Sequence, residues 1–262
     1  MKALCVSGPD VMPAAEPGIV VVDVIAASVD DCDKGRGFVG RVTAVGAGVD
    51  HIKVGMLVAG VSVPQYPEEP GAFSERVAVS ADSVAPVPDG VDVVQAARVG
   101  LSGITALCAL DALGASHLGN LLIHGPVDGV GGFAVQLAKA RGAVVAVVTP
   151  RADAELAHEL GADGVIPEDG DPTGAVQKAR FFLDGRVDSA LHVAGDPAVV
   201  AGVVRPGGRF TSTACPATQV TRADIDYRPT VVVPSGHQLA DLLFKVASRR
   251  LICRVQRTDG VV

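Results

Sequence analysis

Clustered cysteines are missing from this sequence. The cysteines lie far apart, with no CxxC pair and no histidine at ligand spacing, at Cys5, Cys32, Cys108, Cys215 and Cys253. This spacing excludes a disulfide framework and a structural zinc site, so the cysteines are expected to be small buried apolar residues.

Basic residues are fewer than acidic residues in this sequence. The chain of 262 residues has 22 Lys and Arg against 29 Asp and Glu, a formal net charge of −7, and no Lys/Arg cluster. A protein with this charge is not expected to bind nucleic acid or an acidic lipid surface.

Long uninterrupted apolar runs are missing as well. The N-terminus has no charged region followed by a continuous apolar one, and later apolar runs are interrupted by Gly, Pro or charge. Neither a signal peptide nor a membrane span is indicated. We therefore expect a cytoplasmic protein whose partner is a small molecule.

The apolar content that is present falls into two patterns. With 48% hydrophobic residues the chain can bury one large core or two modest ones. Short β-branched runs at 19–27, 40–46 and 54–63, separated by Gly, Pro and Asp, predict a compact, barrel-like β domain. Near residues 90–99 apolar residues begin to recur at three- and four-residue steps, which indicates helices and a domain boundary.

The remainder of the chain alternates between strands and helices. Strands are predicted at 120–125, 143–150, 163–168, 187–195 and 207–214, with helices at 131–142 and 153–162. The strands are apolar on both faces, as a parallel sheet between layers of helices requires. Short links between them predict right-handed crossovers and a doubly wound sheet, so the expected fold class is α/β.

Several segments occur in the order found in one known superfamily. They are PVPDGVDVVQAARVGLSGITALCAL, LLIHGPVDGVGGFAVQLAKARGA, ELGADGVI and VVRPGGRF, preceded by MKAL, VTAVGAGVDHIKVGMLVAG and GAFSERVAVSADSVAPVPDG. The sequence thereby resembles the medium-chain dehydrogenase/reductase superfamily, in its zinc-independent quinone oxidoreductase and enoyl reductase branch, over nearly the whole chain. The resemblance implies a GroES-like β-rich catalytic domain at 1–95 and a Rossmann dinucleotide-binding domain at 96–236. It also implies a C-terminal helix with a shortened return to the catalytic domain at 237–262.

The resemblance implies NADPH as the cofactor. The turn whose backbone N–H groups and helix end hold the pyrophosphate is matched by Gly129, Val130 and Gly131. Thr149 and Arg151 follow the second strand, where a carboxylate would select NADH and a hydroxyl with an arginine accepts a 2′-phosphate. No acidic residue stands between the end of the second strand and Asp153, so the pattern implies NADPH. Arg151 also fits a solvated residue that caps the turn. Thr105, Val193, Ala194 and Thr213 match positions that line the nicotinamide pocket in the family. Each of them also fits an ordinary loop residue.

One residue of the turn departs from the family pattern. Relatives usually carry GAAGGVG there, whereas this chain reads GPVDGVG, with Asp128 in place of a small residue. A carboxylate about 4 Å from a phosphate opposes it by roughly 1 kcal/mol in water and by several at lower dielectric, which weakens binding about tenfold to a thousandfold. Alternatively, Asp128 points outward, or it caps the following helix and takes the N–H groups that a phosphate would need.

The expected catalytic domain is shorter than in relatives, which predicts a more open cleft. The segment SVDDCDKGRG passes almost directly into FVGRVTAVG, and the chain stops soon after the last helical pattern. Asp30 and Asp31 stand where relatives have Asn and Pro, and with Asp33 they form either a general acid/base set or a solvated turn. Tyr66, in a proline-rich loop expected at the cleft rim, either donates a proton to the substrate or packs against the loop.

No metal is expected. Zinc-dependent relatives use a Cys, a Gly-His-Glu motif and often a four-cysteine lobe, and none of these is found in the sequence. His192, at the C-terminal end of the fourth strand, takes a place where relatives usually have Asp or Asn. It either faces the site as a catalytic polar group or is a satisfied, partly buried histidine.

Three functions remain open at this point. The first is an NADPH-dependent, zinc-independent reductase of a quinone or an α,β-unsaturated carbonyl, in which hydride goes to the β carbon. The second is a non-redox enzyme on the same fold, such as a cyclase or isomerase in natural-product (polyketide) biosynthesis, with lost or weakened cofactor binding. The third is a binding protein without catalysis.

A homodimer is also expected. Val231, Val232 and Val233 form a β-branched run after the last Rossmann strand, where relatives pair an edge strand with its mate across a two-fold axis. An exposed edge of that kind needs covering.

Overall fold

The computed structural model describes residues 15–28, 36–62, 71–72, 74–114, 118–214, 220 and 222–254. The chain divides into two compact units, one formed by Met1–Ile104 with Val233–Val262 and the other by Thr105–Val232. These divisions lie close to the limits expected near residues 95 and 236. The domain ranges drawn from the sequence stay predictions.

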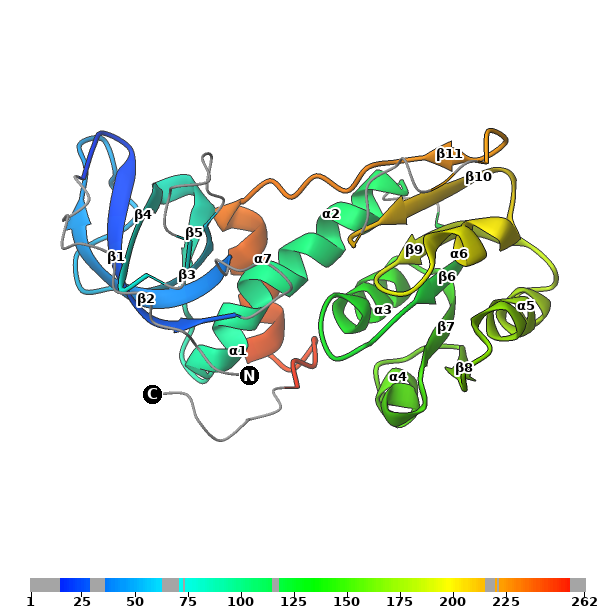
Figure 1. Cartoon of the computed structure of the whole chain (residues 1–262). Helices are drawn as coiled ribbons and strands as arrows, with labels where there is room; N and C mark the ends of the chain where they lie inside the picture. Colours follow the sequence, from blue (N-terminus) through cyan, green and yellow to red (C-terminus); the bar gives the residue numbers. More distant parts are fainter. Residues whose placement is uncertain are drawn as a thin grey trace. The chain divides into compact units, whose positions relative to one another are not determined.

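The first unit contains an antiparallel sheet in the order β4-β1-β2-β3-β5 (Figure 1). Its strands are β1 (Ile19–Ala27), β2 (Gly37–Val45), β3 (Leu57–Val61), β4 (Arg76–Ser80) and β5 (Val84–Pro86). Val20, Val22, Phe38 and Val58 are fully buried in one apolar cluster of this unit. The β-branched runs therefore form strands because their side chains fill a common core.

Helices α1 and α7 belong to the same unit. α1 (Val93–Arg98) begins at a capping box, in which the Asp92 carboxylate accepts from the Val94 N–H and the Gln95 side chain accepts from the Asp92 N–H. It continues into a π-helical stretch, Val99–Gly103. α7 (Gly236–Ala247) packs against β5 and this stretch, so the C-terminal helix completes the first unit.

The second unit is built on a parallel sheet in the order β11-β10-β9-β6-β7-β8. Its strands are β6 (Asn120–His124), β7 (Val144–Pro150), β8 (Gly164–Glu168), β9 (Val187–His192), β10 (Val204–Ser212) and β11 (Asp226–Tyr227). The chain winds outward in one direction from β6 to β8 and then in the other from β9, so the strand order reverses between β6 and β9. This is a doubly wound sheet, and the predicted two-part α/β fold class is confirmed.

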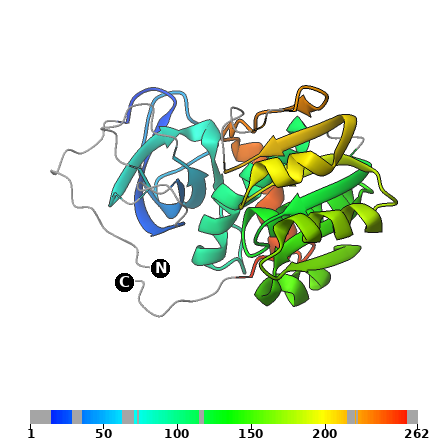
Figure 2. The ribbon, with the colours of Figure 1, turned by 45° about the vertical axis from the view of Figure 1, so that its right-hand side comes forward.

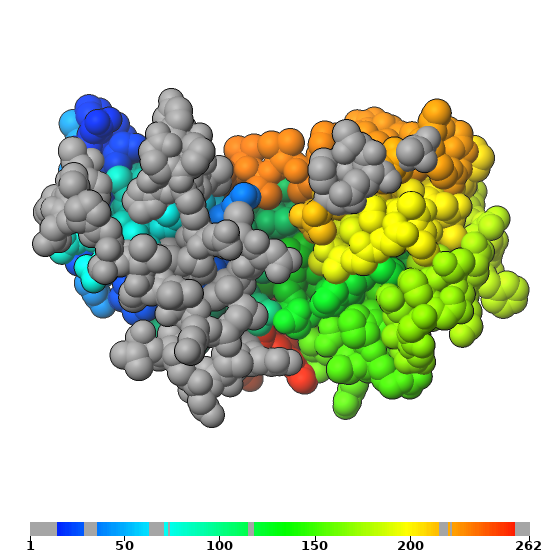
Figure 3. Space-filling view, viewed as in Figure 1, coloured from blue at the N-terminus to red at the C-terminus, as the bar shows by residue number. Residues whose placement is uncertain are grey.

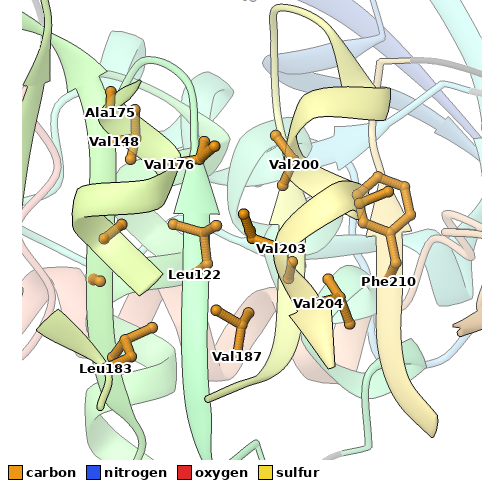
Figure 4. Packing of buried hydrophobic residues seen from close by; sticks show 14 of the residues in the cluster. Leu122, Val148, Ala175, Val176, Leu183, Val187, Val200, Val203, Val204 and Phe210 are labelled. Carbon is orange, nitrogen blue, oxygen red and sulfur yellow. The ribbon is translucent and has the colours of Figure 1, made fainter. Parts of the chain in front are cut away.

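Helices pack against the strands of the second unit. They are α3 (Val130–Ala140), α4 (Ala154–Glu159), α5 (Pro172–Phe182) and α6 (Pro197–Val203), and α2 (Ile104–Ala112) belongs to this unit from Thr105 onward. α5 and α6 pack against each other on one side of the sheet (Figures 1 and 2). Leu122, Val176, Val200 and Phe210 are buried in one cluster between these helices and the strands (Figure 4). The outer sides of α5 and α6 form much of the visible surface of this unit (Figure 3).

Among the described residues, the helical run Val93–Ala112 is long and apolar enough to cross a membrane by length and composition alone. It consists of α1, the π-helical stretch and α2. Because 61% of its most apolar window is buried, the run has the character of a core helix and is weak support for a membrane span.

The edge of the parallel sheet differs from the expectation. The edge strand is β11, which pairs with Arg209 and Phe210 of β10 and was not foreseen from the sequence. Val231 and Val233 lie outside the strands of the single chain and are 65% and 62% exposed. Strand pairing through this segment needs a second chain, so the homodimer stays a prediction.

Candidate functional site

The glycine-rich turn links β6 to α3 at the carboxyl edge of the parallel sheet. β6 ends at His124, and α3 begins at Val130 with Gly129 as its N-cap residue. A Cβ on Gly131 would lie 2.3 Å from the Pro126 carbonyl oxygen. The helix can therefore approach the turn only with glycine at this position, whether or not a phosphate binds there. The N-terminal end of α3 carries the positive end of the helix dipole, which favours a bound anion.

Carboxylates stand at this turn. The first is Asp128, which is exposed. The Asp153 carboxylate, from the short 3-10 turn after β7, accepts a hydrogen bond from the Val127 N–H at 3.1 Å. A backbone N–H of the turn is thus bound by a carboxylate that was not foreseen, because the two residues lie 26 positions apart in the sequence.

The residues expected to recognise a 2′-phosphate follow β7. Thr149 is fully buried, and its hydroxyl has no hydrogen-bond partner within the described part of the chain. Arg151 is exposed and forms a bidentate ion pair with Asp169, with Nε donating to Oδ1 at 2.9 Å. This hydrogen-bonded pairing lowers the pKa of Asp169 and raises that of Arg151. The guanidinium predicted to bind a phosphate is therefore held by a neighbouring carboxylate.

The loop after β9 is hydrogen-bonded to the end of β6, directly before the turn. The Val193 N–H donates to the His124 carbonyl oxygen at 2.8 Å, and the Ala194 N–H reaches the same oxygen at 3.4 Å. After β10, the Thr213 N–H donates to the His192 carbonyl oxygen at 3.0 Å. The structure therefore brings three of the residues expected around a nicotinamide to the edge that carries the glycine-rich turn.

His192 is the polar residue singled out at the end of β9. It is 1% exposed, its Nδ1 lies 2.9 Å from Ser212 Oγ, and its Nε2 lies 3.1 Å from the Gly195 carbonyl oxygen. Because a carbonyl oxygen only accepts, we assign the proton to Nε2, and Nδ1 accepts from the Ser212 hydroxyl. Burial holds the pKa of His192 below its usual range. These are the contacts of a satisfied buried histidine, and a catalytic role for His192 stays a prediction.

His124 stacks beside His192, with ring centroids 6.0 Å apart and planes 10° from parallel. It is 1% exposed, and its Nδ1 lies 2.7 Å from the Ala194 carbonyl oxygen. Its Nε2 lies 3.0 Å from Glu168 Oε2 at the end of β8, a close contact without the alignment of a hydrogen bond. A buried histidine thus lies against a partly exposed carboxylate at the point where β6 enters the turn. Glu168 was not foreseen as part of this edge.

Of the remaining candidates, only Thr105 lies within the described residues. Thr105 stands at the start of the second unit and is 8% exposed. Asp30, Asp31 and Tyr66 fall outside the described residues. Within the described ranges, no three His, Cys, Asp or Glu side chains are grouped so that they could hold a metal ion.

The backbone of this edge leaves the N-terminal end of α3 open to an anion. The N-cap of α3 is a glycine without a side-chain cap. Gly125 approaches the neighbouring loop so closely that a Cβ would lie 2.8 Å from the Ala194 nitrogen. The end of β7 fits a phosphorylated ribose only if Arg151 exchanges Asp169 for the phosphate. The uncapped N-terminus of α3 therefore suits a pyrophosphate, the carboxylates of Asp128 and Asp153 at the turn oppose one, and the adenosine end requires Arg151 to change its partner.

Comparison with known sequences points to one superfamily. Residues 129–237 match the family described as zinc-binding dehydrogenase. The chain is 35% identical over 181 residues to the mycocerosic acid synthase-like polyketide synthase of Mycolicibacterium smegmatis. The aligned segment covers 67% of this chain and 8% of that protein. The chain is also 38% identical over 125 residues to the quinone oxidoreductase of Pseudomonas aeruginosa, and this alignment covers 47% of this chain and 37% of that protein. The chain thus spans less than two thirds of the length of these relatives.

Solved structures share the fold. The quinone oxidoreductase from Coxiella burnetii aligns with a TM-score of 0.76 at 21% identity, over 93% of this chain and 83% of that one. The enoyl reductase CurK aligns with a TM-score of 0.74 at 20% identity, over 92% and 82%. At these identities the likeness shows the fold. Together with the sequence matches and the ordered motifs, it shows that the chain belongs to the medium-chain dehydrogenase/reductase superfamily, in its quinone oxidoreductase and enoyl reductase-like branch.

Proposed function

We propose that this protein is an NADPH-dependent reductase of a quinone or an α,β-unsaturated carbonyl and that it works without zinc. The proposal rests on the arrangement at the carboxyl edge of the parallel sheet. There α3 begins at the N-cap residue Gly129, and the loop after β9 is hydrogen-bonded to the His124 carbonyl oxygen. In doubly wound folds, nucleotides bind at the carboxyl edge where the strand order reverses. A sequence relative named quinone oxidoreductase and a structural neighbour named enoyl reductase support the substrate class.

The chain's residues divide the work between binding and proton transfer. The bound cofactor would supply the hydride. Its pyrophosphate would be held by the backbone of Gly129, Val130 and Gly131 at the positive end of α3. The nicotinamide would lie against Thr105, Val193, Ala194 and Thr213. The proton for the reduced substrate would come from one of the candidate acids, namely Tyr66, His192, Asp30 and Asp31.

The preference for NADPH rests on Thr149 and Arg151. For a 2′-phosphate to bind, Arg151 must leave Asp169, with which it forms an exposed ion pair. Exposed pairs contribute about 0–1 kcal/mol, so a phosphate with more negative charge can displace the carboxylate. Thr149 adds a buried hydroxyl at the same strand end.

Titration of the purified protein with NADPH, followed by cofactor fluorescence, tests the proposal. We expect a dissociation constant in the micromolar range, and weaker binding of NADH. Arg151→Ala should weaken NADPH binding and leave NADH binding unchanged, with Arg180→Ala on α5 as the matched control. Absence of NADPH binding at millimolar concentration would refute the reductase proposal.

A second candidate is a non-redox cyclase or isomerase on the same fold, acting in natural-product biosynthesis. The observation that favours it is the Asp153 carboxylate on the Val127 N–H, together with the exposed Asp128 at the turn. Both charges oppose a pyrophosphate there. If Asp128→Gly converts a protein that does not bind NADPH into one that does, the native turn has moved away from redox chemistry.

We further propose that the protein is a cytoplasmic homodimer that acts on a small molecule and binds neither nucleic acid nor membrane. The net charge of −7 supports the absence of polyanionic partners, and the exposed Val231 and Val233 support pairing with a second copy. The sequence relative that is a polyketide synthase supports a place in polyketide chemistry.

A further inference from the structure

Two loops follow neighbouring strands at the carboxyl edge of the parallel sheet. Strand β9 ends at His192 and strand β10 ends at Ser212, and these two residues are paired in the register of the strands. The Thr213 N–H donates to the His192 carbonyl oxygen at 3.0 Å. Beyond this bond the chain leaves the sheet in the loops 193–195 and 213–214. The spacing between the two loops therefore depends on side chains.

The His192 side chain turns back over the first of these loops. Its Nε2 lies 3.1 Å from the carbonyl oxygen of Gly195, three residues further along the chain. Gly195 has a φ of +95°, a conformation that glycine adopts readily and other residues rarely adopt. Because a carbonyl oxygen only accepts, Nε2 carries the proton and holds the turn 192–195 closed.

The Ser212 hydroxyl orders the second loop. Its Oγ accepts from the Ala214 N–H at 3.1 Å, so the serine closes a turn over residues 212–214. The same Oγ lies 2.9 Å from His192 Nδ1, and burial holds the pKa of His192 below its usual range. The ring is therefore neutral at neutral pH, and the Ser212 hydroxyl donates to the lone pair on Nδ1.

The two turns thus share one chain of hydrogen bonds. It runs from the Ala214 N–H through Ser212 and the His192 ring to the carbonyl oxygen at the end of the first loop. His192 is 1% exposed and Ser212 is 5% exposed, so bulk water would not replace a lost partner. Hydrogen bonds joined in this way polarise and strengthen one another. The chain of bonds therefore couples the positions of the two loops.

We propose that Ser212 is a positioning residue of this site and that it acts through His192. The hydroxyl fixes the orientation of the neutral ring, and the ring then holds residues 193–195 at a set distance from residues 213–214. This role is separate from the transfer of a proton to the substrate.

The two loops carry three residues that the proposed function places against the nicotinamide, namely Val193, Ala194 and Thr213. Their spacing would then decide how closely the nicotinamide is held. This part of the proposal rests on the proposed function. The link between the loops does not rest on it.

Nitrogen-15 NMR of the histidine rings in the full chain at neutral pH tests the link. His192 should carry a proton on Nε2 and none on Nδ1, with its signals assigned by their loss in His192→Gln. Ser212→Ala should move the Nδ1 signal toward that of a nitrogen without a donor, and Ser212→Thr, which keeps a hydroxyl, should restore it. Ser189→Ala, at a buried serine of β9, is the control. A proton on Nδ1, or an unchanged Nδ1 signal in a folded Ser212→Ala variant, would overturn the proposal.

Hydrogen exchange tests whether the effect passes from one loop to the other. The Val193 N–H donates to the His124 carbonyl oxygen, toward β6 and away from β10. Ser212→Ala should speed exchange of this N–H about tenfold relative to the Leu122 N–H in β6, which reports opening of the sheet, and Ser212→Thr should not. A Val193 rate that changes no more than the Leu122 rate would overturn the positioning role.

Nucleotide affinity shows where the effect falls on the cofactor. The two probes are NADPH and 2′-phospho-ADP-ribose, which has the same adenosine end and no nicotinamide. Ser212→Ala should bind NADPH about three- to tenfold more weakly than the wild type, the loss expected for one hydrogen bond, and should bind 2′-phospho-ADP-ribose equally well. Equal losses for the two nucleotides, or unchanged NADPH affinity, would overturn the positioning of the nicotinamide. If the wild type binds no NADPH at all, the proposed function fails, while the ring and exchange signals still decide the role of Ser212.

Discussion

Arg151 and Asp153 stand two residues apart after β7, yet they act on different partners. Arg151 extends to Asp169 across the end of β8, whereas Asp153 returns to the Val127 N–H of the turn. Both contacts change the charge available to a phosphate. Arg151 is already neutralised, and Asp153 brings a negative charge to the place where the pyrophosphate is expected. At this scale the affinity for a cofactor is decided by pairs of side chains.

Asp153→Asn is expected to strengthen NADPH binding about fivefold. The asparagine oxygen can still accept from the Val127 N–H, so the turn keeps its shape while one like charge is removed, worth roughly 1 kcal/mol near the surface. Fluorescence titration measures the change, with Asp89→Asn on the first unit as a control for net charge. Weaker or unchanged binding by the Asp153 variant would show that its carboxylate does not oppose the cofactor.

His192 is expected to make the protein sensitive to mild acid. Burial lowers the pKa of His192 below 6.5, its usual value, so the unfolded chain takes up a proton at a higher pH than the folded chain. The unfolded state therefore binds more protons below about pH 6.5, and stability falls as the pH is lowered through this region. Urea unfolding between pH 5 and pH 7.5 should show this slope in the wild type and a smaller one in His192→Gln. Identical slopes would contradict the prediction.

At the scale of elements, the contact between α3 and the turn depends on glycine. A Cβ on Gly131 would lie 2.3 Å from the Pro126 carbonyl oxygen, and one on Gly132 would lie 2.1 Å from that of Val127. Real Cβ atoms do not come this close, so a larger residue must push the helix away from the turn. The glycines are therefore needed for packing even in a protein that has lost its cofactor, and their presence alone does not prove binding.

Gly131→Ala is expected to destabilise the protein by about 1–3 kcal/mol, because the added methyl group overpacks the turn. Gly202→Ala in α6 is the matched control, since a Cβ there meets nothing within 4 Å. The control should be neutral or stabilising by up to about 1 kcal/mol through the higher helix propensity of alanine. Denaturant unfolding of both variants measures the difference, and equal stabilities would exclude the packing role.

At the scale of the whole molecule, the described chain exposes a β-branched segment that follows the edge strand β11 in the sequence. Val231 and Val233 are 65% and 62% exposed, next to the two-residue strand β11. β-Branched residues left at a sheet edge form a surface to which another strand can be added. A second copy of the chain offers the same segment, and a two-fold axis would pair the two.

The double variant Val231→Asp, Val233→Asp is expected to convert the dimer into a monomer, because four like charges would meet across the paired edge. Sedimentation velocity measures the change. Phe181→Asp, at an 86% exposed position on α5, is the control for removing an exposed apolar side chain elsewhere. A wild-type chain that sediments as a monomer would refute the predicted assembly.

The sequence by itself determined the fold class and most of the strands of the parallel sheet. The run 19–27 forms β1, and β6 to β10 of the parallel sheet lie where apolar runs predicted strands, because burial on both faces leaves a continuous local pattern, whereas the two-residue strand β11 was not predicted. Motif order was enough to identify the superfamily, since the same turns recur at similar positions along the chain. Asp128 was singled out from the sequence as a departure from the family pattern, and the structure leaves it exposed.

Only the tertiary structure decided which side chains meet. Arg151 and Asp169 are 18 residues apart, and Val127 and Asp153 are 26 apart. His124 reaches Glu168 from two strands away, because β7 lies between β6 and β8. No local pattern encodes such pairs, since they form only when parallel strands from distant parts of the chain end at one edge of the sheet.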